Sequence, residues 1–312
     1  MGNVATTVEE QIDKLCSRGM IMDLDIVKVK EILLDIGHYR LGFYRHPFEI
    51  DKKHNLKKGT KFSDILSLYY LDVDLRSLLI KYLNSIEANF KTNLIYFVSN
   101  KNKHNNKWFV DSNVVSVDFI EGKYKIYKGG VKSDRRYGGF KKSVYTDSFK
   151  YNNSPLRKHH KKYKNCKYAP AWKTIEFLTF GQAFTTFISL LNNDLKKEIS
   201  SVYGIQSVTK FENYIRTLVD LRNACAHGNV LFDYQSKNAI TSIPFLNIEK
   251  ESNQSIASCV QVLTHFVGEV SLNRKTDFLN EINSVFVKIK KQFPKNIVAI
   301  ENIILNKMKF NI

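Results

Sequence analysis

The sequence predicts an all-α protein, and three observations carry that prediction. Proline and glycine, which interrupt helices, number only five and fourteen in 312 residues. Apolar residues recur three or four positions apart through most of the chain, which is the spacing of one helix face. Hydrophobic residues make up 43% of the chain, enough for a large core. We expect an N-terminal helical region over residues 1–50, a helical core over 51–240 with an insertion at about 101–167, and C-terminal helices over 241–312.

Two short helices are predicted first. Thr7–Glu10 has the pattern of a capping box, so a helix should run from there through Leu15 and stop near Gly19. A second helix is expected over 25–36, where apolar residues define one buried face, and Gly37 should end it.

An aromatic and basic segment follows at residues 38–48. It contains Arg40 and Arg45, and such a segment can bind nucleic acid when bases stack on its rings and phosphates pair with its cations. In the alternative, its rings dock the N-terminal helices on the core while its cations stay in solvent. Residues 51–61 are polar and predict a loop.

The longest helical pattern covers residues 62–98. A break is expected near Asp72 to Asp74, which predicts two helices rather than one. Glu87 lies at the edge of the apolar stripe. It is expected either to be half-buried, with a cationic or hydrogen-bonding partner, or to be an exposed charge.

Residues 101–167 form a strongly basic insertion. They hold 18 Lys and Arg against 5 Asp and Glu, so most of the chain's net charge of +18 is concentrated there. Tyrosines alternate with these cations, which favours contact with single-stranded nucleic acid over a merely solubilising loop. The stretches 114–120 and 123–127 predict a short β-hairpin, and the rest is expected to be mobile. The predicted RNA-binding residues are Arg40, Arg45, Lys123, Tyr124, Lys125, Tyr127, Lys128, Arg135, Arg136, Lys141, Lys142, Arg157 and Lys158.

Helical patterns resume at Pro170 and continue to the end of the chain. A second capping box, Thr209–Glu212, is predicted to begin the helix that carries the motif described next. Further helical patterns cover 256–270, 278–293 and, after Pro294, a last stretch through Ile304.

The most informative motif is Arg222-Asn223-x-x-x-His227, followed by Gly228. Arginine can hold phosphate oxygens with its planar set of donors, and histidine can move protons near neutral pH, so together they could cleave RNA without a metal. Gly228 is expected to supply a left-handed C-cap, which places His227 in the last turn. In the structural alternative, Arg222 caps a neighbouring helix and His227 does the same locally.

Arg222 and His227 cannot easily aim at one phosphate from a single regular helix. Five steps of 100° separate them by about 140° around the helix and about 7.5 Å along it. Either the helix distorts before His227, or two copies of the helix share one site across a twofold axis. The shared arrangement predicts a homodimer with two arginines and two histidines in one cleft.

Such a cleft has a defined chemistry. One histidine would take the proton from a ribose 2′-hydroxyl while the other protonates the leaving 5′-oxygen, and the arginines would stabilise the charged phosphorane. DNA should be spared because it lacks the 2′-hydroxyl. The products should carry 2′,3′-cyclic phosphate and 5′-hydroxyl ends.

We expect a cytoplasmic protein without a cofactor. No run of about 18 uncharged apolar residues predicts a membrane span, and the first residues lack the pattern of a signal peptide. Four scattered cysteines favour reduced thiols. His159, His160 and Cys166 are the only hint of a metal cluster, and their spacing does not favour zinc.

Several segments resemble the Abi family of bacterial phage-resistance proteins, typified by AbiD and AbiF. The similar segments are Ile36-Gly37-His38-Tyr39-Arg40-Leu41 with Tyr44 and Pro47-Phe48, then Asp74-Leu75-Arg76, Ile86-Glu87, Pro170-Ala171-Trp172, Phe180-Gly181, and Leu221-Arg222-Asn223 with Ala226-His227. The last of these resembles the Arg-x4-His signature of HEPN domains, which are all-α RNases that commonly act as dimers.

The resemblance implies a HEPN-like helical bundle. It maps Arg222, Asn223 and His227 onto the active site, and Glu87 onto an acidic position that orients the arginine. It also implies RNA partners, namely a substrate and a structured noncoding RNA that restrains the nuclease.

The sequence therefore predicts a metal-independent HEPN-type endoribonuclease that acts in abortive-infection antiphage defence or as the toxin of a toxin–antitoxin pair. One alternative is a non-catalytic RNA-binding HEPN protein. Another is a regulator that binds nucleic acid through the basic insertion alone.

Overall fold

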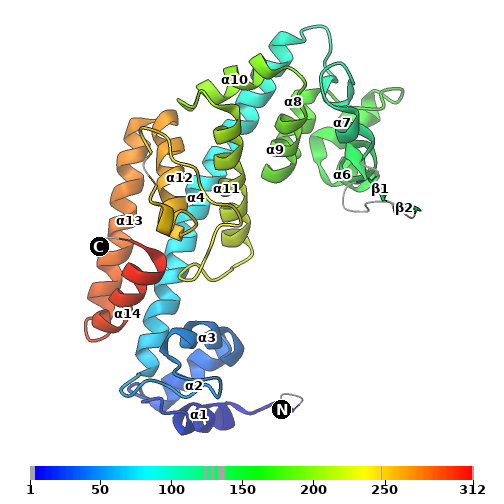
Figure 1. The fold of residues 1–312 in the computed structure, drawn as a ribbon. Coiled ribbons are helices and arrows are strands. Elements are labelled where there is room, and N and C mark those ends of the chain that lie inside the picture. The colour runs from blue at the N-terminus through cyan, green and yellow to red at the C-terminus, as the bar shows by residue number, and fades with distance from the viewer. Residues whose placement is uncertain (1–3, 123–124, 128–129, 133–137, 247, 311–312) are drawn as a thin grey trace. The chain divides into compact units, whose positions relative to one another are not determined.

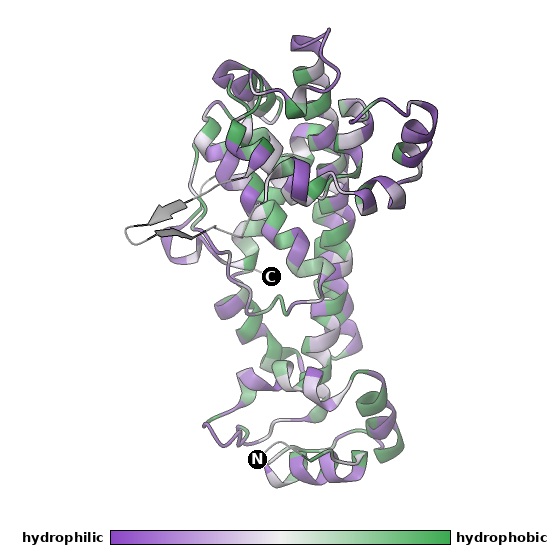
Figure 2. Cartoon of the chain, turned by 90° about the vertical axis from the view of Figure 1, so that its right-hand side faces the viewer, coloured by the Kyte–Doolittle hydropathy of each residue, from purple (hydrophilic) through white to green (hydrophobic). Residues whose placement is uncertain are grey.

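Helices make up most of the described residues, so the predicted all-α class is confirmed, whereas the HEPN-like bundle stays a prediction (Figure 1). The computed structural model describes residues 4–122, 125–127, 130–132, 138–246 and 248–310. Two compact units are present. The first comprises Met1–Lys81, Leu221–Thr264 and Asn273–Ile312, and the second comprises Tyr82–Asp220 with His265–Leu272. Most helices carry both apolar and polar residues, as helices with one buried face do (Figure 2).

The first unit begins with helices α1 (Val8–Ser17), α2 (Ile26–Asp35) and α3 (His38–Arg45). The predicted capping box is present, because the Thr7 hydroxyl accepts from Glu10 N at 3.2 Å and the Glu10 carboxylate accepts from Thr7 N at 2.8 Å. The second helix, predicted over 25–36, is capped by Asp25 and starts one residue later. The aromatic and basic segment at 38–48 forms helix α3 and a 3-10 turn at His46–Phe48 that extends it.

Glu49 follows that turn and joins three cationic or potentially cationic side chains. Its carboxylate accepts from Arg45 Nε at 2.9 Å and contacts His54 Nδ1 at 3.0 Å and His46 Nδ1 at 3.1 Å. Burial alone would raise the pKa of Glu49, but the hydrogen bonds from His54, Arg45 and His46 outweigh burial and hold the pKa at about 2.

We expect this cluster to stabilise the fold in a pH-dependent way. The folded pKa of Glu49 lies below its ordinary value of 4.5. The stabilisation is therefore fully present above pH 4.5 and is lost as the pH falls toward 2. Thermal melting of wild type and Glu49→Gln should differ at pH 6 and converge near pH 2. A difference that stays constant from pH 6 to pH 2 would contradict this assignment.

Helix α4 (Phe62–Lys101) is continuous, so the predicted break at residues 72–74 is wrong. Asp72 is fully buried and hydrogen-bonded, whereas Asp74 is partly exposed and pairs with Lys288 Nζ at 2.6 Å. The two carboxylates leave the helix in different directions, and both have partners. A local cluster of charge therefore does not interrupt the helix.

The C-terminal helices follow the predicted pattern. They are α12 (Ile256–Val270), α13 (Leu272–Gln292) and α14 (Ile297–Ile303), with a π turn at Ile304–Met308. Within the first unit α13 is tied to α4 by the ion pair between Lys81 and Glu281 at 2.7 Å. Asn296 Nδ2 donates to Ser63 Oγ at 2.8 Å at the start of α14.

The basic insertion lies in the second unit and has more structure than predicted. Residues 117–121 form helix α5 (Val117–Glu121) instead of the first strand of the expected hairpin. A small antiparallel pair does exist, formed by β1 (Lys125–Tyr127) and β2 (Gly130–Lys132). The stretch expected to be mobile forms a π turn at Phe140–Val144 and helices α6 (Asp147–Asn152) and α7 (Ser154–Lys162). These pack through Phe140, Tyr145 and Leu156, which are buried.

The rest of the second unit surrounds a cluster of aromatic rings. Helices α8 (Ala171–Thr174), α9 (Phe180–Ser189), α10 (Asn193–Ser201) and α11 (Val208–Ala226) follow in order. The end of α11, from Leu221 on, belongs to the first unit. Phe90 of α4 contacts Phe180, Phe187 and Phe211, with ring centroids 5.8 to 6.3 Å apart. Short 3-10 turns occur at Trp108–Val110 and Ile175–Phe177 in this unit, and at Lys250–Ser252 in the first unit.

Candidate active site

Helix α11 carries the Arg-Asn-x-x-x-His motif at its C-terminal end. Gly228 has a left-handed φ of +67°, as predicted for the C-cap. Gly228 N donates to Cys225 O at 3.2 Å, and Asn229 N donates to Ala224 O at 2.9 Å. This pair of bonds is a Schellman motif, in which a left-handed residue satisfies the last carbonyls of a helix. His227 is thereby the last residue before the chain turns away.

The helix stays regular up to His227. Its backbone N–H donates to Asn223 O at 3.0 Å, the bond expected in an undistorted α-helix. A distortion before His227, one of the two arrangements considered above, is therefore absent. Asn223 and His227 are exposed and Arg222 is partly exposed. Arg222, which can bind phosphate, and His227, which can transfer protons, therefore both lie at the end of this helix in contact with solvent.

The backbone just after His227 is held by side chains from two other helices of the same unit. Arg40 Nη2 on α3 donates to Gly228 O at 2.5 Å. Arg76 Nη1 on α4 donates to Asn229 O at 3.1 Å. Further along, the backbone N–H groups of residues 231 and 232 donate to Asp72 Oδ1 at 2.8 and 3.0 Å. We call residues 228–232 the anchored loop.

Asp72 is the centre of this arrangement. Its second oxygen accepts from Arg76 Nη1 at 2.5 Å and from the Tyr44 hydroxyl at 2.8 Å. Burial holds the pKa of Asp72 above its ordinary value, although the Arg76 guanidinium and the donors of Tyr44 and the loop lower it in part. In each of these hydrogen bonds Asp72 is the acceptor, which is the role of a charged carboxylate. We therefore assign the charged form to Asp72 at neutral pH. Burial also raises the pKa of Tyr44, which stays protonated and donates.

Sequence reasoning missed Asp72 and Tyr44 as part of the site. Asp72 looked like a helix break, and Tyr44 looked like one of several aromatic residues. The available signal was the spacing of Asp72 and Arg76, because a carboxylate and a guanidinium four residues apart lie on the same helix face.

Cys225 lies within the motif but cannot act as a nucleophile there. It is buried, and burial raises the pKa of its thiol to about 12. The thiolate, which is the reactive form, is therefore scarce at neutral pH.

We expect thiol reagents to distinguish the cysteines of the folded protein. Cys16 is exposed and should be alkylated rapidly, whereas Cys225 and Cys259 are buried and should react only after denaturation. Mass spectrometry of labelled peptides measures both rates. Labelling of Cys225 as fast as Cys16 would contradict the buried position of this helix face.

Glu87 lies on α4 in the second unit. It is 8% exposed and its Oε1 pairs with Lys91 Nζ at 2.7 Å. Lys91 also donates to Glu176 O at 3.3 Å. Of the two expectations for Glu87, burial with a cationic partner is the one found. Its role in orienting Arg222 stays a prediction.

The two predicted RNA-binding arginines of α3 have structural partners. Arg45 is only 7% exposed and pairs with Glu49. Arg40 holds the anchored loop. Among the rings of the same segment, Tyr44 and Phe48 are buried while Tyr39 and Phe43 are exposed. The segment therefore docks against the core on one face and offers aromatic surface on the other.

The predicted RNA-binding residues of the insertion are only partly described. Lys123, Tyr124, Lys128, Arg135 and Arg136 lie outside the described residues. Lys125 and Tyr127 belong to β1. Of the remaining four, Lys141 pairs with Glu121, and Lys142, Arg157 and Lys158 are exposed. RNA binding by these side chains stays a prediction.

A basic groove of about 660 Å³ surrounds Arg157 in the second unit. The guanidinium of Arg157 lies over the Tyr151 ring at 5.3 Å. Sequence reasoning did not single out the other cations of the groove, because their convergence depends on the packing of α6 and α7. These are Lys150, Lys164 and Lys167, and the His160 ring also lines the groove.

His160 and Cys166, which hinted at a metal cluster, have other contacts. His160 Nε2 contacts the Tyr145 hydroxyl at 2.8 Å, and its Nδ1 contacts the backbone carbonyl of Cys166 at 3.1 Å. Within the described ranges, His, Cys, Asp and Glu side chains form no group of three or more suited to a metal ion. No helix there has the length and apolarity needed to cross a bilayer.

The family model for Abi-like proteins matches residues 31–233. This match covers most of the chain, and the protein belongs to the Abi-like protein family. The matched region begins in α2 and ends just past the anchored loop, so it includes Arg40, Asp72, Arg76 and the whole motif. No curated protein and no solved structure gives a significant match to the chain.

Proposed function

We propose that this Abi-like protein is a metal-independent endoribonuclease of the HEPN type that acts in abortive-infection defence or as a toxin. The observation that carries the proposal is the motif geometry. Exposed Asn223 and His227 with partly exposed Arg222 lie at the end of a regular helix, and the adjacent loop is fixed by Arg40, Arg76 and Asp72.

The active unit in this proposal is a homodimer. A regular helix separates Arg222 and His227 by about 140°, so one chain cannot easily bring both to one phosphate. A twofold axis near the end of α11 places two arginines and two histidines around a single cleft. Each chain therefore supplies half of the catalytic groups.

The reaction is an internal transfer of the phosphoryl group. His227 of one chain takes the proton from a 2′-hydroxyl, whose oxygen forms a bond to phosphorus while the bond to the 5′-oxygen breaks. His227 of the other chain donates a proton to that leaving oxygen. The two Arg222 guanidinium groups neutralise charge that develops on the non-bridging oxygens. Asn223, in the next position, supplies an amide able to bind the same phosphate.

The basic groove around Arg157 is a candidate RNA-binding site outside the proposed catalytic cleft. Exposed cations attract the phosphates, and Tyr151 offers a ring for stacking. The same groove favours the alternative function, in which the protein binds RNA without cutting it. In this proposal a structured noncoding RNA bound there restrains the nuclease.

Expression in bacteria separates the two functions. We expect wild type to arrest growth and Arg222→Ala and His227→Ala to be tolerated at equal protein levels. Arg216→Ala, in the same helix and exposed, is the matched control and should remain toxic. If both active-site variants arrest growth as wild type does, RNA cleavage by this motif is not the cause of toxicity.

A further inference from the structure

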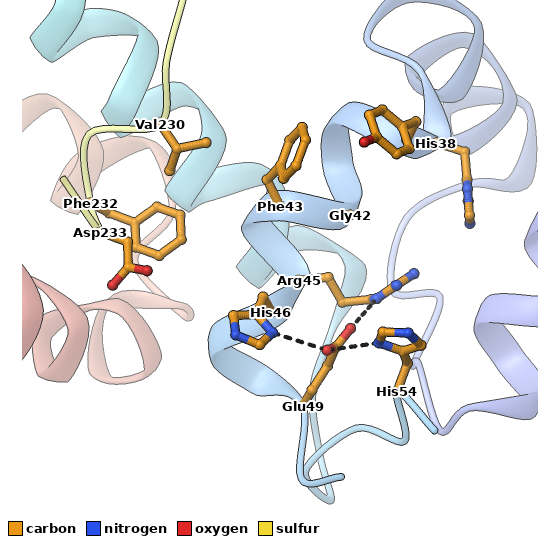
Figure 3. A pocket seen from close by; sticks show the side chains of 11 residues that line it. His38, Gly42, Phe43, Arg45, His46, Glu49, His54, Val230, Phe232 and Asp233 are labelled. Atoms are coloured by element: carbon orange, nitrogen blue, oxygen red, sulfur yellow. Dashed lines mark hydrogen bonds and ion pairs between the residues drawn. The ribbon is translucent and has the colours of Figure 1, made fainter. Parts of the chain in front are cut away.

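A pocket of about 550 Å³ lies on helix α3 beside the anchored loop (Figure 3). One side comes from α3 and the turn that follows it, and the other comes from Val230, Phe232 and Asp233. Both sides belong to the first unit. The volume is in the range of sites that bind small organic groups. The proposed cleavage chemistry does not use this pocket.

Gly42 forms the open floor of the pocket. Residues three and four positions away share its helix face, and all four line the pocket, namely His38, Tyr39, Arg45 and His46. A Cβ built on Gly42 would meet no atom within 4 Å, and its backbone is helical. Neither packing nor conformation therefore requires glycine, although alanine would favour the helix more. The missing side chain leaves the pocket open.

Aromatic rings border this open floor. Tyr39 and Phe43 are 82% and 43% exposed and touch edge to face, with centroids 5.2 Å apart. Figure 3 shows Phe43 on the side of the helix that faces Val230 and Phe232 of the loop. Exposed rings of this kind are platforms on which a planar heterocycle stacks.

The polar lining suits the edge of such a heterocycle. His38 is one of the residues that line the pocket. Burial, with Arg45 nearby, lowers the pKa of His38, so its ring is neutral and carries one donor and one acceptor. Below it lie His46, Glu49 and His54, joined by the contacts drawn in Figure 3. The pocket thus combines stacking surface with directional polar groups.

The pocket lies close to the proposed catalytic histidine. Val230 follows His227 by three residues, so their Cα atoms are at most about 11 Å apart. Arg40, Arg76 and Asp72 fix the loop between them. A nucleotide chain that places a phosphate at His227 can therefore reach the pocket within one or two nucleotides.

We propose that this pocket takes an unstacked base of a single-stranded RNA substrate, one or two nucleotides from the phosphate that is cleaved. The stated distance from the cleaved phosphate depends on the proposed function, because it assumes that cleavage occurs at His227. Base binding itself can be measured without cleavage, so the two proposals can fail separately.

The test uses full-length protein carrying His227→Ala, so that RNA stays intact, and single-stranded RNAs with 5-iodouridine for photocrosslinking. We expect crosslinks to the peptide that contains Tyr39 and Phe43. Gly42→Leu, which fills the pocket, and Phe43→Leu, which removes a ring, should each weaken RNA binding about tenfold and lose that crosslink. Tyr96→Leu is the matched control, since Tyr96 is an exposed ring outside the pocket.

Gly42→Ala adds an internal control for folding, because it should raise the melting temperature while reducing the crosslink. The proposal is overturned if Gly42→Leu and Phe43→Leu bind and crosslink like their His227→Ala parent. It is also overturned if crosslinks map only to residues 138–167, or if the pocket binds free nucleotides but not RNA. Loss of the crosslink in the pocket variants, together with a wild type that does not cleave RNA, would support the pocket and reject the nuclease.

Discussion

His227→Ala should abolish measurable RNA cleavage by the purified protein while leaving the fold intact. In the proposed dimer this substitution removes the general base and the general acid together, and each typically contributes a factor of 10² to 10⁴ in rate. Because His227 is exposed and its backbone bond to Asn223 is independent of its side chain, thermal stability should change little. Cleavage of a labelled RNA under single-turnover conditions measures the rate.

His104→Ala is the matched control, because His104 is also exposed but lies outside the motif. It should cleave at the wild-type rate. Arg222→Ala should lose cleavage by about 10² to 10³, the usual cost of removing a donor that stabilises developing charge. An active His227→Ala protein, or a His104→Ala protein as impaired as His227→Ala, would contradict the assignment.

Asp72→Ala should have the largest effect on stability. The substitution removes the acceptor for Tyr44, for Arg76 and for two backbone N–H groups of the anchored loop. It leaves Arg76 half-buried without its counter-charge. Breaking such a buried pair costs about 3–5 kcal/mol. Denaturant unfolding followed by circular dichroism measures the loss.

Asp74→Ala is the control for this prediction. Asp74 lies two residues further along α4 and pairs with Lys288 at the surface. Loss of an exposed pair costs about 0–1 kcal/mol. If Asp72→Ala destabilises the protein no more than Asp74→Ala, then Asp72 does not hold the loop. Under native conditions Asp72→Ala should also reduce cleavage, because the backbone next to His227 loses its supports.

Local sequence patterns predicted the helices well and also predicted the end of α11. A capping box and a periodic apolar face are encoded within one or two turns, which is why α1 and α12 begin where expected. The left-handed C-cap at Gly228 is equally local. The capping box expected at Thr209 is wrong, because the Ser207 hydroxyl accepts from Lys210 N and the helix begins at Val208.

The supports of the candidate site could not be predicted in the same way. Arg40 and Gly228 are 188 residues apart, and the acceptor is a backbone carbonyl that every residue has. Asp72 and the loop N–H groups it binds are about 160 residues apart. Only the folded chain brings these groups together. In the insertion, many lysines obscured the few apolar residues, Phe140 and Leu156 among them, around which the short helices pack.

The chemistry of the RNA ends tests the proposed function most directly. RNA should be incubated with wild type, His227→Ala and His104→Ala in the presence of EDTA, and the product ends should be identified enzymatically and by mass spectrometry. We predict fragments with 2′,3′-cyclic phosphate and 5′-hydroxyl ends from wild type and His104→Ala, and intact RNA with His227→Ala. Fragments with 5′-phosphate and 3′-hydroxyl ends, or cleavage that requires a divalent metal, would contradict catalysis by Arg222 and His227.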